Sequence, residues 1–503
     1  MNKNVVIIGA GLGGLFTGAI LSKEGFRVTL LEQNSTVGGG LQSFRRFGEI
    51  FDTGMHIIGG LSSDGNIRRI CQYLGISDKI KIQDVDDNCT SSLYFSEDRR
   101  HYKIAKGKDG FVSSLAAYFP NEKANLEEYV KAIYNIAEQV NLFNLRPSDG
   151  NISLFSQSED FLMSANKFIA KYITDEKLRS IVAYMNPLYG GIADHTPAYI
   201  HALISVLYLK GTCRFVGGSS HVADLLAMIV KENGGRVICN EKVNKIATKD
   251  KTVEYVEGIS GNRYNADIYI SAIHPCSMLS LLDDNAFPKS YKNRLECIPN
   301  SYSAFSLFIK LKENSFPYIN YSEFYMTRYE DVWEFGNKSK PWPLGFLFMT
   351  PPEREQGIYS NKVIVMAPMP FDYVSEWRET TVGKRGVEYL KWKEQRTEEL
   401  LVQIEEIHPG FRDCIVAVNT ASPLTIRDFY GVKDGSISGF SKDCDNIVLS
   451  QVPVVTKIKN LLLTGQNNNL HGFCGVPLTA VTTCEAILGN NYIINKIHAC
   501  SSI

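Results

Sequence analysis

The sequence shows no excess of charge of either sign. Its 53 lysine and arginine residues are balanced by 54 aspartate and glutamate residues, which gives a formal net charge of −1 over 503 residues. Proteins that bind nucleic acids usually concentrate positive charge to attract the phosphate backbone. We therefore expect no nucleic acid among the partners of this protein.

Eleven cysteines are present, but they form no CxxC pair and no cluster with histidine at the spacing of a metal site. This pattern argues against a metal centre and against a redox-active dithiol. The odd number and wide separation of the cysteines fit a reducing compartment better than a disulfide framework. The expected localisation is therefore cytoplasmic.

No segment approaches the roughly 20 consecutive apolar residues that a membrane-spanning helix requires. The sequence thus predicts a soluble protein, which leaves room for peripheral contact with a membrane surface. A chain of 503 residues also exceeds what one compact core usually accommodates, so we expect two domains.

A βαβ pattern opens the chain. Residues 4–8 (NVVII) and 27–32 (RVTLLE) have the composition of buried strands, and residues 13–24 between them show a helical pattern. Such a unit is typical of an α/β fold with a parallel sheet.

The turn between the first strand and the helix is rich in glycine. Gly9, Gly11 and Gly14 have the spacing GxGxxG, and Gly13 lies in the same turn. In this motif the first glycine allows a tight turn, the second lets the backbone approach a pyrophosphate, and the third lets helix and strand pack closely. The helix N-terminus offers N–H groups to phosphates, and Glu32 after the second strand can accept hydrogen bonds from ribose hydroxyls. We interpret the segment as a dinucleotide-binding site.

The C-terminal part has a comparable order of elements. Residues 460–463 (NLLL) read as a strand, residues 465–475 as a glycine-containing loop, and residues from about 476 to 488 as a helix. In the middle of the chain, residues 236–240 (RVICN) and 242–246 (KVNKI) are predicted to form a pair of strands. We expect both chain ends to build one domain. The predicted division is a dinucleotide-binding domain of residues 1–75, 206–284 and 436–503, and a substrate-binding domain of residues 76–205 and 285–435.

Several segments resemble one group of flavoproteins. They are a second glycine cluster at Gly38, Gly39 and Gly40, and residues 51–60 (FDTGMHIIGG), 422–440 (SPLTIRDFYGVKDGSISGF) and 461–488 (LLLTGQNNNLHGFCGVPLTAVTTCEAIL). Together they resemble the FAD-dependent retinol saturase, carotenoid isomerase and phytoene desaturase family, which belongs to the amine oxidase-type flavoproteins. The resemblance implies an α/β fold with a discontinuous, Rossmann-like FAD-binding domain of the glutathione reductase type and an inserted α+β substrate domain.

The same resemblance implies FAD as the cofactor and assigns residues to it. Val243 would meet the adenine end through its backbone, and the loop that starts at Gly465 would pass the pyrophosphate and the ribityl chain. Gly475 and Val476 would begin a helix whose positive end faces the flavin. Gly40, like its neighbour Gly39, belongs to the second cluster. It stands where amine oxidases usually have an arginine, which the saturase-like branch commonly lacks.

The sequence contains no second GxGxxG motif. We therefore expect no resident nicotinamide-binding domain. Electrons would come from the substrate, from an electron-donor partner, or from NAD(P)H that binds only transiently.

An apolar segment, residues 198–209 (AYIHALISVLYL), stands out in the predicted substrate domain. Its only polar interruptions, His201 and Ser205, lie four residues apart and therefore on one stripe of a helix. The helix is either part of the core or borders a tunnel or membrane surface through which an oily substrate enters.

Two histidines are candidate catalytic residues. The resemblance places His56 and His471 beside the flavin ring, and an imidazole with a pKa near 6.5 can exchange a proton near neutral pH. The alternative is that each histidine only bonds a neighbouring turn. Cys474 is either a packed thiol or a site of covalent flavin attachment, and Tyr184 and Tyr189 are weaker candidates for a proton donor.

These observations favour an FAD-dependent oxidoreductase that adds or removes hydrogen across a carbon–carbon double bond of a long apolar substrate, such as a polyene, an isoprenoid or an unsaturated lipid. Three alternatives stay open. They are a redox-neutral polyene isomerase that uses reduced FAD, an FAD-dependent amine oxidase, and a flavin-binding carrier without turnover.

Overall fold

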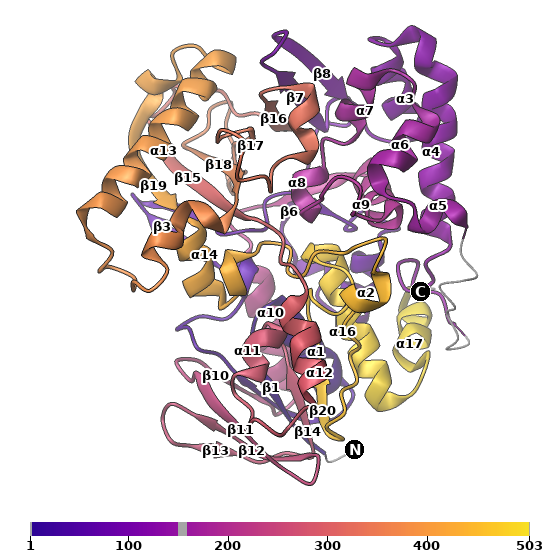
Figure 1. Ribbon diagram of the computed structural model, residues 1–503, viewed down its shortest axis with the longest axis vertical. Helices are drawn as coiled ribbons and strands as arrows, with labels where there is room; N and C mark the ends of the chain where they lie inside the picture. Colours follow the sequence, from indigo (N-terminus) through magenta and orange to yellow (C-terminus); the bar gives the residue numbers. More distant parts are fainter. Residues whose placement is uncertain (1–2, 149–157, 502–503) are drawn as a thin grey trace.

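The computed structural model describes residues 3–148 and 158–501 of the chain. Figure 1 shows a parallel sheet near the N-terminus in the lower part of the molecule, and a larger sheet beside a group of helices in the upper part. The C-terminal helices α16 (Gly472–Leu488) and α17 (Tyr492–Ser501) return to the lower part.

The lower sheet is parallel throughout and combines strands from distant parts of the sequence. Its order is β10-β2-β1-β14-β20. This arrangement confirms the predicted α/β class with a Rossmann-like sheet. The strands are β1 (Asn4–Ile8), β2 (Arg27–Leu31), β10 (Arg236–Ile238), β14 (Ile268–Ser271) and β20 (Leu461–Leu463).

Both faces of this sheet are covered, which explains why its strands are apolar at almost every position. Val5 and Ile7 of β1 face one core and Val6 and Ile8 face another, because successive side chains of a strand alternate between faces. The first core includes α1 (Leu12–Lys23), α10 (Ser220–Glu232) and α16, and the second includes the antiparallel strands β11 (Val243–Lys249), β12 (Thr252–Gly258) and β13 (Arg263–Tyr264).

The predicted pairing of residues 236–240 with 242–246 is wrong. β10 pairs in parallel with β2, whereas β11 turns away and pairs with β12. Both segments are strands, as predicted, but a short turn between two strands does not require them to be neighbours. The open edge beside β2 accepts the first segment instead.

The upper sheet has the order β19-β15-β18-β17-β16-β7-β8. Its side chains alternate: Phe346 and Phe348 of β17 pack in the core with α13 (Gly386–Ile407), whereas Leu347 and Met349 face the core of the rest of the molecule. The strands are β7 (Ser91–Phe95), β8 (Arg100–Ile104), β15 (Ser303–Leu311), β16 (Ser322–Met326), β17 (Gly345–Met349), β18 (Lys362–Met369) and β19 (Ile415–Ala421).

The helical group surrounds α9, which covers Ala198–Leu209 as predicted. His201 of this helix is fully buried and its ring bonds the hydroxyl groups of Tyr129 at 2.7 Å and Tyr189 at 3.1 Å. This stripe of α9 therefore belongs to the core. The other helices of the group are α3 (Lys108–Ala116), α4 (Lys123–Glu138), α5 (Glu159–Leu162), α6 (Ala165–Tyr172), α7 (Glu176–Val182) and α8 (Asn186–Tyr189).

Two small sheets position the segment of residues 51–60. The hairpin of β3 (Ser43–Arg46) and β4 (Glu49–Asp52) leads into it, and β5 (Ile58–Gly59) then pairs with β9 (Thr212–Phe215), which also pairs with β6 (Ile82–Asp84). β5 contacts both α9 and α16. The segment thus lies next to the apolar helix and the C-terminal loop.

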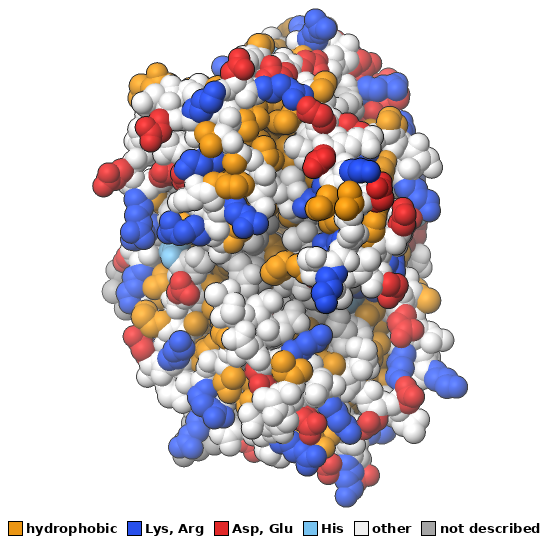
Figure 2. Space-filling model, turned by 90° about the vertical axis from the view of Figure 1, so that its left-hand side faces the viewer, with side chains coloured by type: hydrophobic (Ala, Val, Ile, Leu, Met, Phe, Trp, Pro, Cys, Tyr) orange, Lys and Arg blue, Asp and Glu red, His pale blue; other side chains and the backbone are white. Residues whose placement is uncertain are grey.

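None of the helices in the described ranges combines the length and apolarity needed to cross a membrane. Figure 2 shows charges of both signs scattered over one face, in keeping with the near-zero net charge. The remaining helices named below are α2 (Asn66–Leu74) and α14 (Pro423–Tyr430).

Candidate functional site

A cavity of about 460 Å³, here named the first cavity, lies at the C-terminal ends of the parallel strands. Its lining includes nine of the residues singled out from the sequence for cofactor binding. They are Gly9, Gly11, Gly13, Glu32, Gly39, Gly40, Val243, Gly465 and Val476. Residues separated by more than 450 positions in the sequence are thus brought together.

Glycine is required in this lining for reasons of space. A Cβ atom on Gly13 would lie 2.9 Å from the Cα atom of Gly465, so the start of α1 and the loop after β20 approach too closely for any side chain. Gly14 and Gly475 do not line the first cavity. A Cβ atom on Gly14 would lie 2.0 Å from the carbonyl oxygen of Gly9, and one on Gly475 would lie 2.3 Å from Leu470. These two glycines therefore serve packing.

Glu32 is buried and braces the glycine turn. Its carboxylate accepts hydrogen bonds from the backbone N–H groups of Ala10 and Asn34, each at 2.9 Å. Burial raises the pKa of Glu32 above its ordinary value, and these backbone N–H groups oppose that rise. The side chain thus connects the turn after β1 with the end of β2, beside the first cavity.

The C-terminal helix begins earlier than predicted. α16 starts at Gly472, with His471 as its N-cap, so Gly475 and Val476 lie inside the helix and do not open it. The resemblance implies a start at Gly475 and Val476, three to four residues beyond the start that the structure shows. In the structure Pro477 lies beyond the first turn, and the unbonded N–H groups of the helix end belong to residues next to Gly472.

A second cavity of about 140 Å³ adjoins the first. Both predicted catalytic histidines line it, together with Cys474 and with Leu207 of α9. The residues that line the first and the second cavity alike are Gly40, Met55, Tyr430, Ile437 and Gly472.

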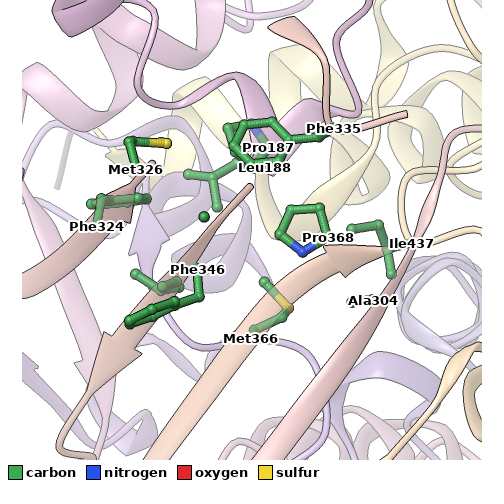
Figure 3. Close-up of a pocket in the computed structure, with 12 residues that line it drawn as sticks. Pro187, Leu188, Ala304, Phe324, Met326, Phe335, Phe346, Met366, Pro368 and Ile437 are labelled. Carbon is green, nitrogen blue, oxygen red and sulfur yellow. The ribbon is translucent and has the colours of Figure 1, made fainter. Parts of the chain in front are cut away.

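A third cavity continues the second between α8 and the upper sheet, and Figure 3 shows its lining. Its residues are apolar throughout, and five of them also line the second cavity: Pro187, Leu188, Leu347, Met366 and Ile437. The volume is only about 10 Å³. Flexible methionine side chains at Met326 and Met366 allow the space to widen.

Residues 12–333 match the family described as flavin-containing amine oxidoreductase. The chain belongs to this family. Its members contain a flavin, and the chain is an oxidoreductase of this flavin-containing class.

Three known proteins are similar to this chain. All-trans-retinol 13,14-reductase of Danio rerio is 28% identical over 97% of this chain and 86% of its own length. Prolycopene isomerase 1 of an Oncidium hybrid cultivar is 24% identical over 92% of this chain and 80% of its own length. A solved structure of a putrescine oxidase triple mutant has a TM-score of 0.65 at 13% identity, covering 97% of this chain and 99% of its own. The structural likeness concerns the fold.

The first cavity fits the dinucleotide part of the flavin cofactor of this family. Its glycine floor leaves the backbone N–H groups accessible to phosphate oxygens, because Gly13 and Gly465 have no side chains to cover them. Its volume falls within the range of cofactor sites. The strand-end location is where open α/β sheets bind their ligands.

His56 and His471 are buried in the second cavity with unused hydrogen-bonding capacity. Neither ring nitrogen of His56 has a hydrogen-bond partner among the described residues, and the same holds for Nε2 of His471. Burial lowers the pKa of each histidine to about 4. Both rings are therefore neutral at neutral pH.

Cys474 lines the second cavity as a packed thiol. Its Sγ atom lies 3.7 Å from Oδ1 of Asn66, and burial raises the pKa of Cys474 to about 12. The sulfur is thus protonated at neutral pH, which suits the packed-thiol interpretation better than nucleophilic attachment to a flavin. Tyr184 and Tyr189 line none of the three cavities, and their hydroxyl groups bond Ser91 and His201.

Tyr430 was not singled out from the sequence although it lines both the first and the second cavity. It ends α14 inside the segment 422–440 that carries the family resemblance, and burial raises its pKa to about 12. A Cβ atom on Gly54 would lie 2.6 Å from its hydroxyl oxygen. Its place next to Gly54 depends on contacts between distant segments, which no local pattern reveals.

The apolar helix α9 contributes a second face to the site. Ile204, Leu207 and Tyr208 line the second cavity, whereas Leu203 is buried in the core away from it. One face of α9 thus lies in the core and another lines a cavity, while the entry of an oily substrate along this helix stays a prediction.

We expect the free energy of unfolding to fall as the pH is lowered from about 6.5 to about 4. Burial lowers the pKa of His56, His274 and His471 to about 4 and that of His201 to about 3. In this range the unfolded chain binds protons that the folded chain does not, so acid favours unfolding. Urea titrations at pH 7 and pH 5 should differ by on the order of 1 kcal/mol per histidine. Equal stability at the two pH values would contradict the burial of these rings.

Proposed function

We propose that this chain binds FAD in the first cavity and reduces a carbon–carbon double bond of a long apolar polyene that occupies the second and third cavities. The observation that carries the proposal is the continuity of the three cavities. Ile437 lines all of them. A dinucleotide site, a space with two neutral histidines and a wholly apolar extension thus follow one another. The similarity to an all-trans-retinol 13,14-reductase over 97% of the chain supports the same chemistry.

Bound FAD would supply the hydride, and the protein side chains would bind the cofactor, provide the proton and align the substrate. Glu32 and the glycines around Gly13 would hold the adenosine and pyrophosphate end, and Val243 would contact it through its backbone. After taking up a second proton, His471 or His56 would deliver it to the neighbouring substrate carbon, since the apolar walls keep bulk water away. The apolar lining of the third cavity would align the chain of the substrate.

The proposal extends to the division of the chain and to its surroundings. Residues 1–75, 206–284 and 436–503 would form the FAD-binding domain, and the two intervening segments would form the substrate-binding domain. Electrons would arrive from a partner or from transiently bound NAD(P)H. All eleven cysteines are free, in keeping with a reducing compartment such as the cytoplasm, and an oily substrate suggests peripheral contact with a membrane.

Isomerisation without net reduction is the second candidate. The similarity to prolycopene isomerase over 92% of the chain favours it. The same cavities and the same reduced flavin would serve both reactions, so the product decides between them.

The test is a single-turnover experiment. The flavin-loaded protein is reduced without oxygen and then mixed with an all-trans polyene alcohol or a polyene hydrocarbon. Reduction predicts reoxidation of the flavin and a product heavier by two hydrogens. Isomerisation predicts a flavin that is still reduced after the reaction and a product with the same mass as the substrate. An unaltered polyene and an unaltered flavin with both substrates would contradict the proposed function.

We expect Glu32→Gln to weaken FAD binding about 10- to 100-fold, on the order of the 1.5–3 kcal/mol of a hydrogen bond to a charged group. Ala10 and Asn34 bond different oxygens of Glu32, and glutamine replaces one of these acceptors with an N–H₂ donor. Equilibrium titration of the flavin-free protein with FAD measures the change. Glu388→Gln, at an exposed position of α13, is the matched control and should bind FAD as the unmodified protein does.

We expect Met366→Trp to slow the reaction with long polyenes at least about tenfold while FAD stays bound. Met366 lines the second and third cavities, and an indole ring at this position would close the passage between them. Overfilling a packed space is costly, whereas a leucine of similar volume is usually tolerated. Met366→Leu is therefore the control. Equal rates for both variants would remove the third cavity from the substrate path.

A further inference from the structure

His56 lines two cavities. One is the second cavity, and the other is a space of about 10 Å³, here named the small cavity. The small cavity is lined by Asp52, His56, Arg214, Phe215, Met349, Pro351, Pro352 and Ile364. Its only side chains with nitrogen or oxygen atoms are those of Asp52, His56 and Arg214.

Arg214 of β9 is a buried cation without a carboxylate partner. Its side chain is 2% exposed, and its two terminal nitrogens donate to the carbonyl oxygens of Ile319, Thr350 and Tyr321 and to the hydroxyl of Ser322. Within the described ranges it forms no ion pair, and its Nε atom has no hydrogen-bond partner. A buried cation normally requires compensation by negative charge or further hydrogen bonds. Asp52 is the only acid that lines the small cavity, and the charge of Glu323, which is not part of this lining, also acts on Arg214.

Asp52 is the last residue of β4, and the hydrogen bonds from described residues to its carboxylate all go to one of the two oxygens. Oδ1 accepts hydrogen bonds from Oγ of Ser43 at 2.8 Å, from the backbone N–H of Ser219 at 2.6 Å and from Oγ of Ser219 at 3.0 Å. No side-chain or backbone donor of the described residues bonds Oδ2. This second oxygen is thus available to the small cavity.

The small cavity has the dimensions and the polar groups that hold one water molecule. A buried water needs about 10–15 Å³ and two to four polar partners. All three polar side chains of the lining have unused atoms: the Nε–H group of Arg214 can donate, Oδ2 of Asp52 can accept, and both ring nitrogens of His56 lack a partner among the described residues. A single water would therefore satisfy one unused atom on each of the three side chains.

We propose that one water in the small cavity connects His56 to Asp52 and Arg214, and that Asp52 is the positioning residue that keeps a proton on the ring nitrogen of His56 facing it. The inference rests on the proposed function, since it gives His56 its role in the second cavity. The water would accept from the N–H groups of His56 and Arg214 and donate to Asp52. The lone pair of His56 would then point into the second cavity.

Electrostatics favours this tautomer over the opposite one. Burial has the largest effect on the pKa of His56 and lowers it, Asp52 raises it, and Arg214 has a smaller lowering effect. The net field of the two neighbours therefore attracts the ring proton toward Asp52. A second proton would then enter and leave the ring only at the nitrogen that faces the second cavity. An acid that orients a histidine in this way fixes both the tautomer and the direction of proton exchange.

Asp52→Asn is a sharp test because it changes one atom of the arrangement. The amide oxygen can keep the place of Oδ1 and its three hydrogen bonds, and the amide N–H₂ replaces Oδ2. The water would then accept from both Asn and Arg214 and could only donate to His56, which would move the ring proton to the other nitrogen. Ser43→Ala is the control, because it removes one bond to Oδ1 and leaves both carboxylate oxygens.

The measurement is ¹⁵N NMR of the flavin-loaded protein labelled at histidine, with the signals of His56 assigned from the His56→Gln variant. We expect the protonated and unprotonated ring nitrogens to exchange places in Asp52→Asn and to stay unchanged in Ser43→Ala. In the unmodified protein, the ring N–H should show contacts to Met349 and not to Cys474. Unchanged ring signals in Asp52→Asn would overturn the proposal. A ring N–H that contacts Cys474 in the unmodified protein would also overturn it, and this second measurement needs no variant.

Single-turnover oxidation of the reduced flavin by the polyene separates this inference from the proposed function. We expect a loss of about 10- to 100-fold in Asp52→Asn, the range typical of residues that orient a functional histidine. A changed tautomer with an unchanged rate would leave the positioning role of Asp52 intact and would instead contradict the role of His56 in the proposed reaction.

Discussion

Replacement of His471 by alanine should leave FAD bound and slow the oxidation of reduced flavin by a polyene at least about a hundredfold. His471 is the N-cap of α16 and lines the second cavity, where its Nε2 atom has no partner among the described residues. A positioned acid commonly contributes about 10² to 10⁴ in rate. His56→Ala should act in the same direction, because His56 lines the same cavity.

Rapid mixing of the flavin-loaded, reduced variants with substrate measures this effect directly. His195→Ala, which changes an exposed histidine outside the three cavities, is the control and should react at the normal rate. If the histidines only brace their turns, the variants should lose stability or flavin affinity before they lose rate. Normal flavin oxidation in both variants would remove the histidines from the reaction.

Replacement of Gly13 by valine should reduce flavin occupancy to less than about a tenth. Even a single Cβ atom would lie 2.9 Å from Cα and 3.2 Å from the backbone nitrogen of Gly465. Backbone atoms cannot move aside as a flexible side chain can, so α1 and the loop after β20 must separate, and overfilling of this kind typically costs about 1–3 kcal/mol. The proposed phosphate-binding floor of the first cavity lies at this contact.

The ratio of flavin to protein absorbance in the purified variant reports the occupancy, and addition of FAD shows whether it can be restored. Gly357→Val is the matched control, because a Cβ atom there meets nothing within 4 Å. A Gly13→Val variant with full flavin content would show that the close approach of the two segments is dispensable.

The parts of the molecule that local chemistry dictates could be predicted from the sequence. The glycine turn after β1 follows from residue spacing, and β1 and α9 have the predicted ranges. α16 begins four residues before the predicted start, because the helix accommodates Pro477 beyond its first turn. The neighbours of β10 and β11 are set by the edge of a sheet built from distant strands, which no local pattern encodes.

The candidate site divides in the same way. Glycines and histidines in recognisable motifs were predicted, and the structure brings His56 and His471 into one cavity. Their roles stay predictions. Tyr430, Met366 and Arg214 could not be found, because each acquires its place through contacts with segments more than 50 residues away in the sequence. An isolated tyrosine, methionine or arginine has no distinguishing pattern.

The arrangement of the parallel sheet determines when the protein can take up its cofactor during synthesis. β1 ends at Ile8, but the strand that completes the sheet begins at Leu461 and the helix that packs on α1 begins at Gly472. Because domains fold from the N-terminus as the chain leaves the ribosome, the glycine turn emerges long before the loop at Gly465 that it contacts in the folded protein. Nearly the whole chain must be translated before Gly13 can meet Gly465. We therefore expect flavin incorporation to be a late event in biogenesis.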